Sequence, residues 1–189
     1  WDNRETEGIV NDAKFIEGAK VLSQMGLSLD IMQSFPQLAE IAEFAKAVPD
    51  LPIIVNHVGG VSRVGIYAGK DDEIIPVWKE GITAAAACHN VTMKLGGLGM
   101  PRFGFGWHAR EVPIGSEELA ESMAPWMRHC IEQFGPDRCM FESNFPPDKV
   151  SFSYNVMYNA FKRLSKEYSA AERAALFHDT AVRVYGIEP

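Results

Sequence analysis

Four polar side chains stand at or near the ends of short apolar runs that are typical of buried strands: Gln33, His57, Lys94 and Asn144. In parallel α/β proteins the carboxyl ends of the strands meet at one edge of the sheet, and functional residues gather there. An imidazole at such a place can act as a general acid or base near neutral pH. His57 is therefore the first catalytic candidate, and the alternative is a structural histidine that hydrogen-bonds a neighbouring loop.

A long, aromatic and basic loop over residues 99–110 carries Arg102 and Arg110. Long loops in compact domains often form lids or binding loops. A guanidinium group can hold a carboxylate through two hydrogen bonds, so we expect Arg102 to bind an anionic group of a substrate. For Arg110 a solvated surface position is favoured. The three cysteines form no Cys-x-x-Cys pair and no zinc-ligand cluster with the five histidines.

Alternating strands and helices must position these residues. Strands are predicted near residues 27–33, 52–57, 91–96 and 138–144, and helices over 12–25, 37–47, 75–89, 116–134, 154–166 and 169–185. This alternation implies parallel pairing through right-handed crossovers. The sequence has no G-x-G-x-x-G motif and no P-loop. The predicted fold class is α/β, and four strands make half of a (β/α)8 TIM barrel.

Two charged residues interrupt these strands, Lys94 in the third and Glu142 in the fourth. Side chains alternate along a strand, so Lys94 shares a face with Thr92 and Gly96, while Met93 points toward the helices. An unpaired buried charge is very costly. If the two strands are neighbours, we expect Lys94 and Glu142 to form an ion pair inside the barrel.

Charge and composition exclude several kinds of partner. The 189 residues include 18 basic and 25 acidic side chains, a net charge of −7, and no polybasic stretch. We therefore expect neither nucleic acid nor a membrane as a partner. Unpaired cysteines favour a reducing, cytoplasmic compartment. The chain opens at Trp1 without a Met or a signal peptide, so we expect it to begin within something larger.

Four segments together form a recognisable pattern: residues 51–59 (LPIIVNHVG), 90–98 (NVTMKLGGL), 138–146 (RCMFESNFP) and 180–186 (TAVRVYG). They resemble the amidohydrolase-2 family, the branch of TIM-barrel hydrolases that includes 2-pyrone-4,6-dicarboxylate and sugar-acid lactonases. The resemblance implies that residues 1–189 are one partial domain, the C-terminal half of the barrel, with strands five to eight. The family's His-x-His motif, at the end of the first strand, would lie upstream.

The resemblance also implies departures at the site. Metal-using relatives place a histidine after the fifth strand and an aspartate after the eighth, where this sequence has Gln33 and Asn144. An amide is a weak, neutral ligand and cannot act as a general base. The sixth-strand histidine is kept as His57, so no cofactor is expected, with a divalent metal such as zinc as the alternative. Asp148 is a candidate substitute acid, and its alternative role is to cap the next helix.

The leading hypothesis is a hydrolase that opens a lactone or related cyclic ester of a small, carboxylated substrate. His57 would be the central catalytic group, with Asn144 and Asp148 beside it, and Gln33, Arg102 and Lys94 would contact the substrate. One alternative keeps the fold and uses zinc, as a hydrolase or a non-oxidative decarboxylase. Another is a truncated, non-catalytic barrel fragment. A half-barrel exposes sheet edges, so we expect a homo-oligomer or association with a missing N-terminal half.

Overall fold

The computed structural model describes residues 7–188, so that Trp1, where the chain begins, lies outside them. One parallel sheet has its strands in chain order. The strands are β1 (Leu29–Ile31), β2 (Ile53–Val55), β3 (Val91–Leu95) and β4 (Cys139–Phe141). All four predicted strands are present, and each is shorter than its predicted range. Sequential parallel order is what the predicted half-barrel requires.

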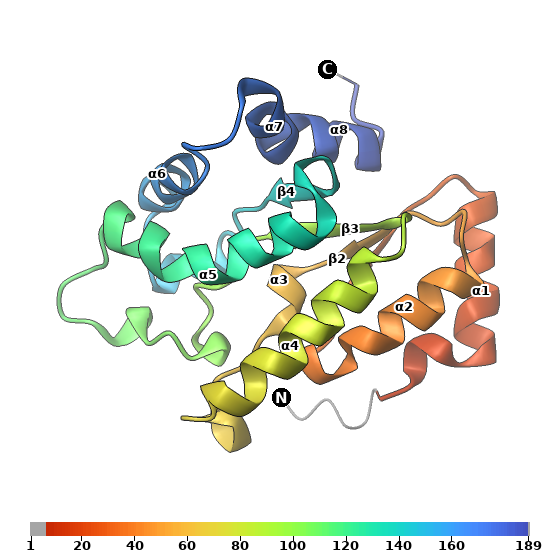
Figure 1. Ribbon diagram of the computed structural model, residues 1–189, viewed down its shortest axis with the longest axis horizontal. Coiled ribbons are helices and arrows are strands. Elements are labelled where there is room, and N and C mark those ends of the chain that lie inside the picture. The colour runs from red at the N-terminus through yellow and green to blue at the C-terminus, as the bar shows by residue number, and fades with distance from the viewer. Residues whose placement is uncertain (1–6, 189) are drawn as a thin grey trace.

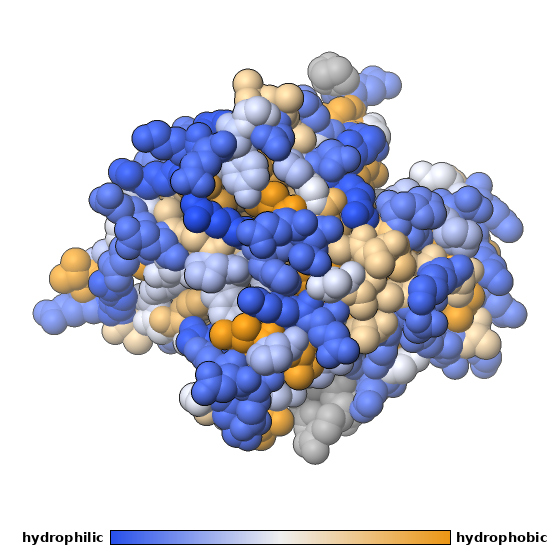
Figure 2. Space-filling model, viewed as in Figure 1, coloured by the Kyte–Doolittle hydropathy of each residue, from blue (hydrophilic) through white to orange (hydrophobic). Residues whose placement is uncertain are grey.

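Each strand is followed by a helix that packs on the same side of the sheet. The longer helices are α1 (Ala13–Gln24), α2 (Leu38–Ala47), α4 (Asp71–Ala86), α5 (Ser116–Phe134) and α6 (Tyr154–Leu164). Helices α2, α4, α5 and α6 lie side by side in that order (Figure 1). Their outward surface is largely hydrophilic, with scattered apolar areas (Figure 2). Within residues 7–188, no helix combines the length and apolar character needed to cross a membrane.

The two faces of the sheet differ in what they pack against. Ile53, Val55 and Met93 are fully buried in the main apolar core, on the face that the helices cover. Ile54, which alternates with them, is also fully buried but lies outside that core cluster. Its neighbours in register are Asp30 on β1 and Thr92 on β3. The predicted division of the strand residues between the two faces is confirmed.

The last segment of the chain reaches across the sheet. The predicted helix over residues 169–185 is α7 (Ala170–Ala174), a π-helical turn (Ala175–Asp179) and α8 (Thr180–Tyr185). Thr180 at the start of α8 donates its hydroxyl to the carbonyl of Asp137, 3.1 Å away and just before β4. Tyr185 at the end of α8 donates to Asp30 on β1, at 3.0 Å. Helix α8 therefore connects the two outer strands of the sheet.

The predicted strand over residues 52–57 ends at Val55, and the turn after it begins at His57 itself, which was not predicted. Strand β2 ends at Val55, and α3 (His57–Gly60) follows as a single helical turn. His57 and Val58 have φ values of 56° and 53°, and Gly60 has 64°. A positive φ is strained for a β-branched residue such as Val58 and costs on the order of 1–3 kcal/mol. The buried Val58 carbonyl is held by the indole of Trp78 at 2.8 Å, which helps to fix the turn.

We predict that Gly60→Ala strongly destabilises the protein. A Cβ at Gly60 would lie 1.8 Å from the backbone oxygen of Gln33. Backbone strain and the overlap together should lower the free energy of unfolding by about 2–4 kcal/mol. Gly65→Ala is the matched control, because φ there is also +60° but nothing lies within 4 Å of the added methyl group. The control should lose about 1 kcal/mol. Equal losses in urea unfolding would contradict a close contact between α3 and the end of β1.

Candidate active site

His57 and Glu142 form a close pair at the carboxyl edge of the sheet. One carboxylate oxygen of Glu142, Oε1, lies 2.6 Å from Nδ1 of His57 and 3.2 Å from its backbone nitrogen. The two side chains are 12% and 15% exposed, so water competes little for this contact. An ionised carboxylate can only accept hydrogen bonds, so we assign the ring hydrogen to Nδ1. Within residues 7–188, Nε2 of His57 has no hydrogen-bond partner.

Two glycines at the end of β3 make this contact possible. A Cβ at Gly97 would lie 2.3 Å from Nδ1 of His57, and a Cβ at Gly96 would lie 2.4 Å from Cγ of Glu142. Because both residues lack a side chain, Glu142 after β4 reaches His57 after β2 across the end of β3. The Gly96–Gly97 pair, which as a motif signals only a tight turn, has a specific packing function here.

Asn144 and Asp148 form a second pair on the segment after β4. The side-chain nitrogen of Asn144 donates to Asp148 Oδ1 at 2.7 Å, and Asn144 has a φ of 47°. The other carboxylate oxygen, Oδ2, accepts the backbone N–H of Gly99 at 3.1 Å. Ser151 donates its hydroxyl to the carbonyl of the same glycine. Asp148 therefore fixes the orientation of Asn144 and ties it to the loop after β3.

Asp148 lies inside the short helix Pro147–Val150, and its carboxylate bonds Gly99 rather than the start of a helix. The side chain is fully buried. This burial raises the pKa of Asp148 to about 6, although the hydrogen bonds from Asn144 and Gly99 and the charge of His57 act in the opposite direction. A buried acid of this kind changes its charge within the ordinary working range of an enzyme.

Buried polar atoms without partners mark the ends of β1 and β2. Gln33 is 7% exposed, and neither its amide nitrogen nor its amide oxygen finds a partner in the described part of the chain. The side-chain oxygen of Asn56, directly before His57, is in the same condition. The position of Gly60 against the Gln33 carbonyl places Gln33 next to the turn that carries His57. An unsatisfied buried polar group costs about 1–3 kcal/mol and requires an explanation.

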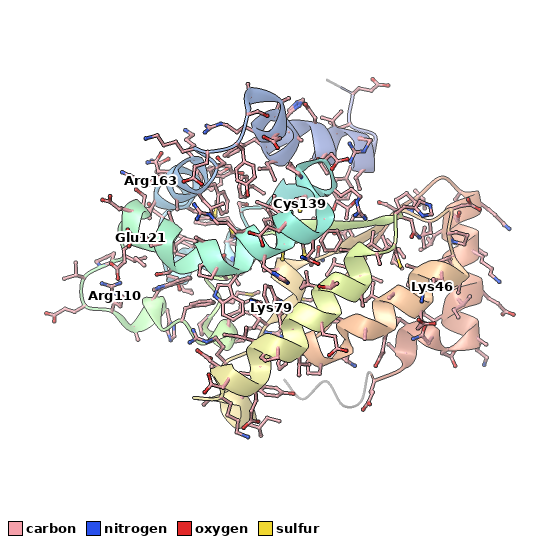
Figure 3. The ribbon with its side chains drawn as sticks, in the orientation of Figure 1. Lys46, Lys79, Arg110, Glu121, Cys139 and Arg163 are labelled. Carbon is pink, nitrogen blue, oxygen red and sulfur yellow. The ribbon has the colours of Figure 1, made fainter. Side chains whose placement is uncertain are left out.

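The loop after β3 carries two arginines, one beside a residue that contacts His57 and one that pairs with a glutamate. Arg102 lies in the short helix Pro101–Phe103, and the ring of Phe103 contacts that of His57 edge-on, with centroids 6.4 Å apart. Burial lowers the pKa of Arg102, which nevertheless stays a cation. Arg110 extends on the outer part of the loop (Figure 3) and pairs with Glu118 at 2.6 Å, so its predicted surface position is confirmed.

Lys94 is engaged elsewhere. Its ammonium lies 2.5 Å from Asp30, and the hydroxyl of Tyr185 bonds the same carboxylate. Burial alone would lower the pKa of Lys94, but hydrogen bonds with Asp30 and Tyr185 raise it above its usual value and keep the side chain charged. The predicted pairing of Lys94 with Glu142 is therefore wrong. The two strands are neighbours, yet Lys94 reaches across β2 to β1, while Glu142 turns to His57.

Comparison with known proteins places this chain in a family. The sequence model for the family described as Amidohydrolase matches residues 3–187. The chain belongs to this amidohydrolase family. A crystal structure of an amidohydrolase from Burkholderia multivorans with bound zinc has the same fold, with a TM-score of 0.83 and 24% identity over 99% of this chain and 62% of that one. The four strands are thus the C-terminal half of an amidohydrolase TIM barrel.

Two curated relatives match nearly the whole of this chain. The uncharacterized protein y4mH of Sinorhizobium fredii is 36% identical over 90% of this chain and 51% of its own length. The L-fucono-1,5-lactonase of Burkholderia multivorans is 26% identical over 98% of this chain and 60% of its own length. The chain therefore spans only about half to three fifths of these relatives.

The donor set that this chain contributes does not by itself fit a divalent metal. Among residues 7–188, no three His, Cys, Asp or Glu side chains lie close enough together to hold a metal ion. His57 can offer a metal only Nε2, because Nδ1 is hydrogen-bonded to Glu142, and Asn144 points its amide nitrogen at Asp148. An amide nitrogen is not a metal ligand of the kind that zinc prefers.

Glu142 is the functional candidate that sequence reasoning placed with the wrong partner. A charge within an apolar strand indicated a buried partner, and His57 and Glu142 both stand at strand ends that share the carboxyl edge of the sheet. The structure brings His57, Gln33, Asn144, Asp148 and Arg102 to the segments that follow the four strands. It keeps Lys94 in a separate ion pair.

We predict that Asp148→Asn changes how stability depends on pH. The folded state holds the proton of Asp148 more tightly than the unfolded chain, since its pKa is raised from 3.8 to about 6. As pH rises from 4 to 7, the wild type should therefore lose up to about 3 kcal/mol of unfolding free energy relative to the variant. Urea unfolding across this range measures the difference.

Asp50→Asn, at an exposed aspartate, is the matched control for that experiment. It should follow the wild type at every pH. A constant difference between the wild type and Asp148→Asn from pH 4 to 7 would show that Asp148 has the same pKa in the folded and unfolded states, against this prediction.

Proposed function

We propose that this segment carries the catalytic base of a hydrolase that opens a lactone or related cyclic ester of a small, carboxylated substrate. Membership of the amidohydrolase family and the lactonase from Burkholderia multivorans support the reaction class. The observation that carries the proposal is a group of polar atoms at the carboxyl edge, on Gln33, Asn56 and His57, that find no partner among residues 7–188. A polar ligand bound there would satisfy them.

The proposed chemistry begins at His57. Nε2 accepts a proton from a water molecule as its oxygen attacks the lactone carbonyl carbon. The tetrahedral intermediate then collapses with cleavage of the ring C–O bond, and the imidazolium returns the proton to the leaving alkoxide. Lactone and water thereby give the open hydroxy acid, and His57 regains its starting state.

Gln33 and Asn144 have roles that their hydrogen bonds allow. The amide nitrogen of Gln33 can donate to the lactone carbonyl or to a substrate hydroxyl, and its oxygen can accept from a hydroxyl. The side-chain nitrogen of Asn144 donates a hydrogen bond to Asp148, so its side-chain oxygen remains to accept the second hydrogen of the attacking water. Donors aimed at a developing oxyanion are a large part of the catalysis of acyl transfer.

Arg102 is proposed to bind the carboxylate of the substrate. It lies next to Phe103, whose ring touches His57, so its loop borders the catalytic base. A half-buried guanidinium interacts with an anion more strongly than a fully solvated one. We further propose that the complete activity belongs to a protein in which four additional strands close the barrel.

A zinc-dependent hydrolase is the second candidate, favoured by the zinc in the amidohydrolase structure from Burkholderia multivorans. In that case ligands from outside the described residues would have to supply most of the site. Metal analysis of the purified protein distinguishes the two candidates. Stoichiometric zinc, together with loss of activity on chelation, would favour the second.

We predict that the protein hydrolyses members of a panel of aldono-1,4-lactones, aldono-1,5-lactones and pyrone lactones at a rate unchanged by EDTA. His57→Ala should lower kcat by at least about 100-fold, because it removes the general base. His178→Ala, at an exposed histidine, is the matched control and should keep full activity. Absence of turnover with every lactone, with and without added zinc, would overturn the proposed function.

We also predict that Arg102→Gln raises KM for carboxylated lactones about tenfold or more and changes kcat little, because a charge-assisted contact with the substrate is lost. For uncharged lactones KM should stay the same. Arg110→Gln is the control, since Arg110 pairs with Glu118. Equal effects of both substitutions, or an effect of Arg102→Gln on every lactone, would remove Arg102 from the substrate site.

A further inference from the structure

We propose that Glu142 is a positioning residue that holds His57 with its hydrogen on Nδ1 and thereby presents Nε2 as the base. This inference rests on the proposed function for its kinetic consequence, but the hydrogen position can be measured independently. Glu142 does not touch the substrate in this scheme. It acts through the imidazole alone.

The contact between Glu142 and His57 restrains the imidazole at two points. Glu142 Oε1 accepts from both the backbone nitrogen of His57, at 3.2 Å, and ring atom Nδ1, at 2.6 Å. One oxygen thus holds a side chain and its own backbone, which restrains both the position and the rotation of the ring. The other histidine–carboxylate pair among the described residues, His178 with Asp179, has side chains 63% and 60% exposed. That pair lies in water, where such contacts are weak.

Three neighbouring features of the backbone make room for this contact. Gly96 and Gly97 leave room for Glu142 and for the imidazole, respectively. The turn at His57 and Val58 keeps two non-glycine residues at positive φ. Strain of this kind persists only where the surrounding structure holds it, and it concentrates at functional sites. A contact that only stabilised the fold would not require the strained turn to lie at the histidine itself.

The hydrogen bond from Nδ1 also decides which ring nitrogen of His57 is basic. A neutral imidazole has one nitrogen that donates and one that accepts, and the partner of the first decides which is which. With Glu142 as acceptor at Nδ1, the hydrogen stays there and Nε2 is the basic atom. The carboxylate also stabilises the imidazolium that forms when Nε2 takes a proton. In the proposed site no further protein group is needed to orient the base.

Nitrogen-15 NMR of histidine-labelled protein tests the inference without any substrate. His57 is assigned by the signals that disappear in His57→Ala. At a pH high enough for the ring to be neutral, His57 should show a protonated Nδ1 and an unprotonated Nε2. Glu142→Met removes the carboxylate that accepts the Nδ1 hydrogen, so the preference for a protonated Nδ1 should disappear. Asp179→Asn is the control and should leave the His57 signals unchanged, because it alters only the exposed pair.

Kinetics provide the second measurement. Glu142→Met should lower kcat about 100-fold or more, with KM changed less than about threefold, because the base loses its orientation while the substrate contacts remain. Glu142→Gln keeps an oxygen acceptor of the same length and should recover part of kcat and of the Nδ1-protonated form. If circular dichroism shows that Glu142→Met does not fold, Glu142→Gln alone decides the outcome, through its effects on kcat and on the Nδ1-protonated form of His57.

Failure of the positioning role of Glu142 and failure of the proposed function give different results. A wild-type His57 protonated on Nε2 would overturn the inference whatever the enzyme hydrolyses. Full kcat in a folded Glu142→Met would overturn it as well. If no lactone is turned over but the NMR results are as predicted, the positioning of His57 stands and the proposed function fails.

Discussion

The hydrogen bond between Glu142 and His57 is the contact on which the rest of the site depends. It joins the ends of β2 and β4 across β3, at a separation of 2.6 Å between Oε1 and Nδ1. The intervening strand must therefore end without side chains, and Gly96 and Gly97 meet that condition. The backbone before and after His57 must also turn sharply, which the positive φ values at His57 and Val58 accomplish. A substitution at any of these positions would alter the same imidazole.

Burial gives the neighbouring groups their properties. Asp148 is fully buried, and it fixes Asn144 on one side and the loop at Gly99 on the other. This arrangement converts a flexible amide into a fixed acceptor and donor. Gln33 carries the opposite feature, two buried amide atoms without partners in the described chain. Fixed groups beside unsatisfied ones are expected where a polar ligand is to be bound.

The sequence predicted the architecture well because strands and helices repeat with clear periods. Strong apolar runs such as residues 53–55 located all four strands, and the polar residues after them located the catalytic edge. The turn at His57 was not predictable, because a valine at positive φ contradicts local preference and is imposed by tertiary contacts. The partners of Lys94 and Glu142 were missed because a strand pattern gives the face of a side chain, not its reach across a neighbouring strand. The distant Asp30 and Tyr185 became neighbours only in the folded chain.

A crystal structure of the protein with a lactam analogue of an aldonolactone tests the central claim most directly. A lactam keeps the ring and the carbonyl and is hydrolysed far more slowly than the ester. The account predicts that a water molecule lies within hydrogen-bond distance of His57 Nε2 and faces the lactam carbonyl carbon, with the Gln33 amide bonded to the ligand. A ligand bound away from the carboxyl edge, or bound there with the Gln33 amide still unpartnered and His57 Nε2 far from the carbonyl, would contradict it.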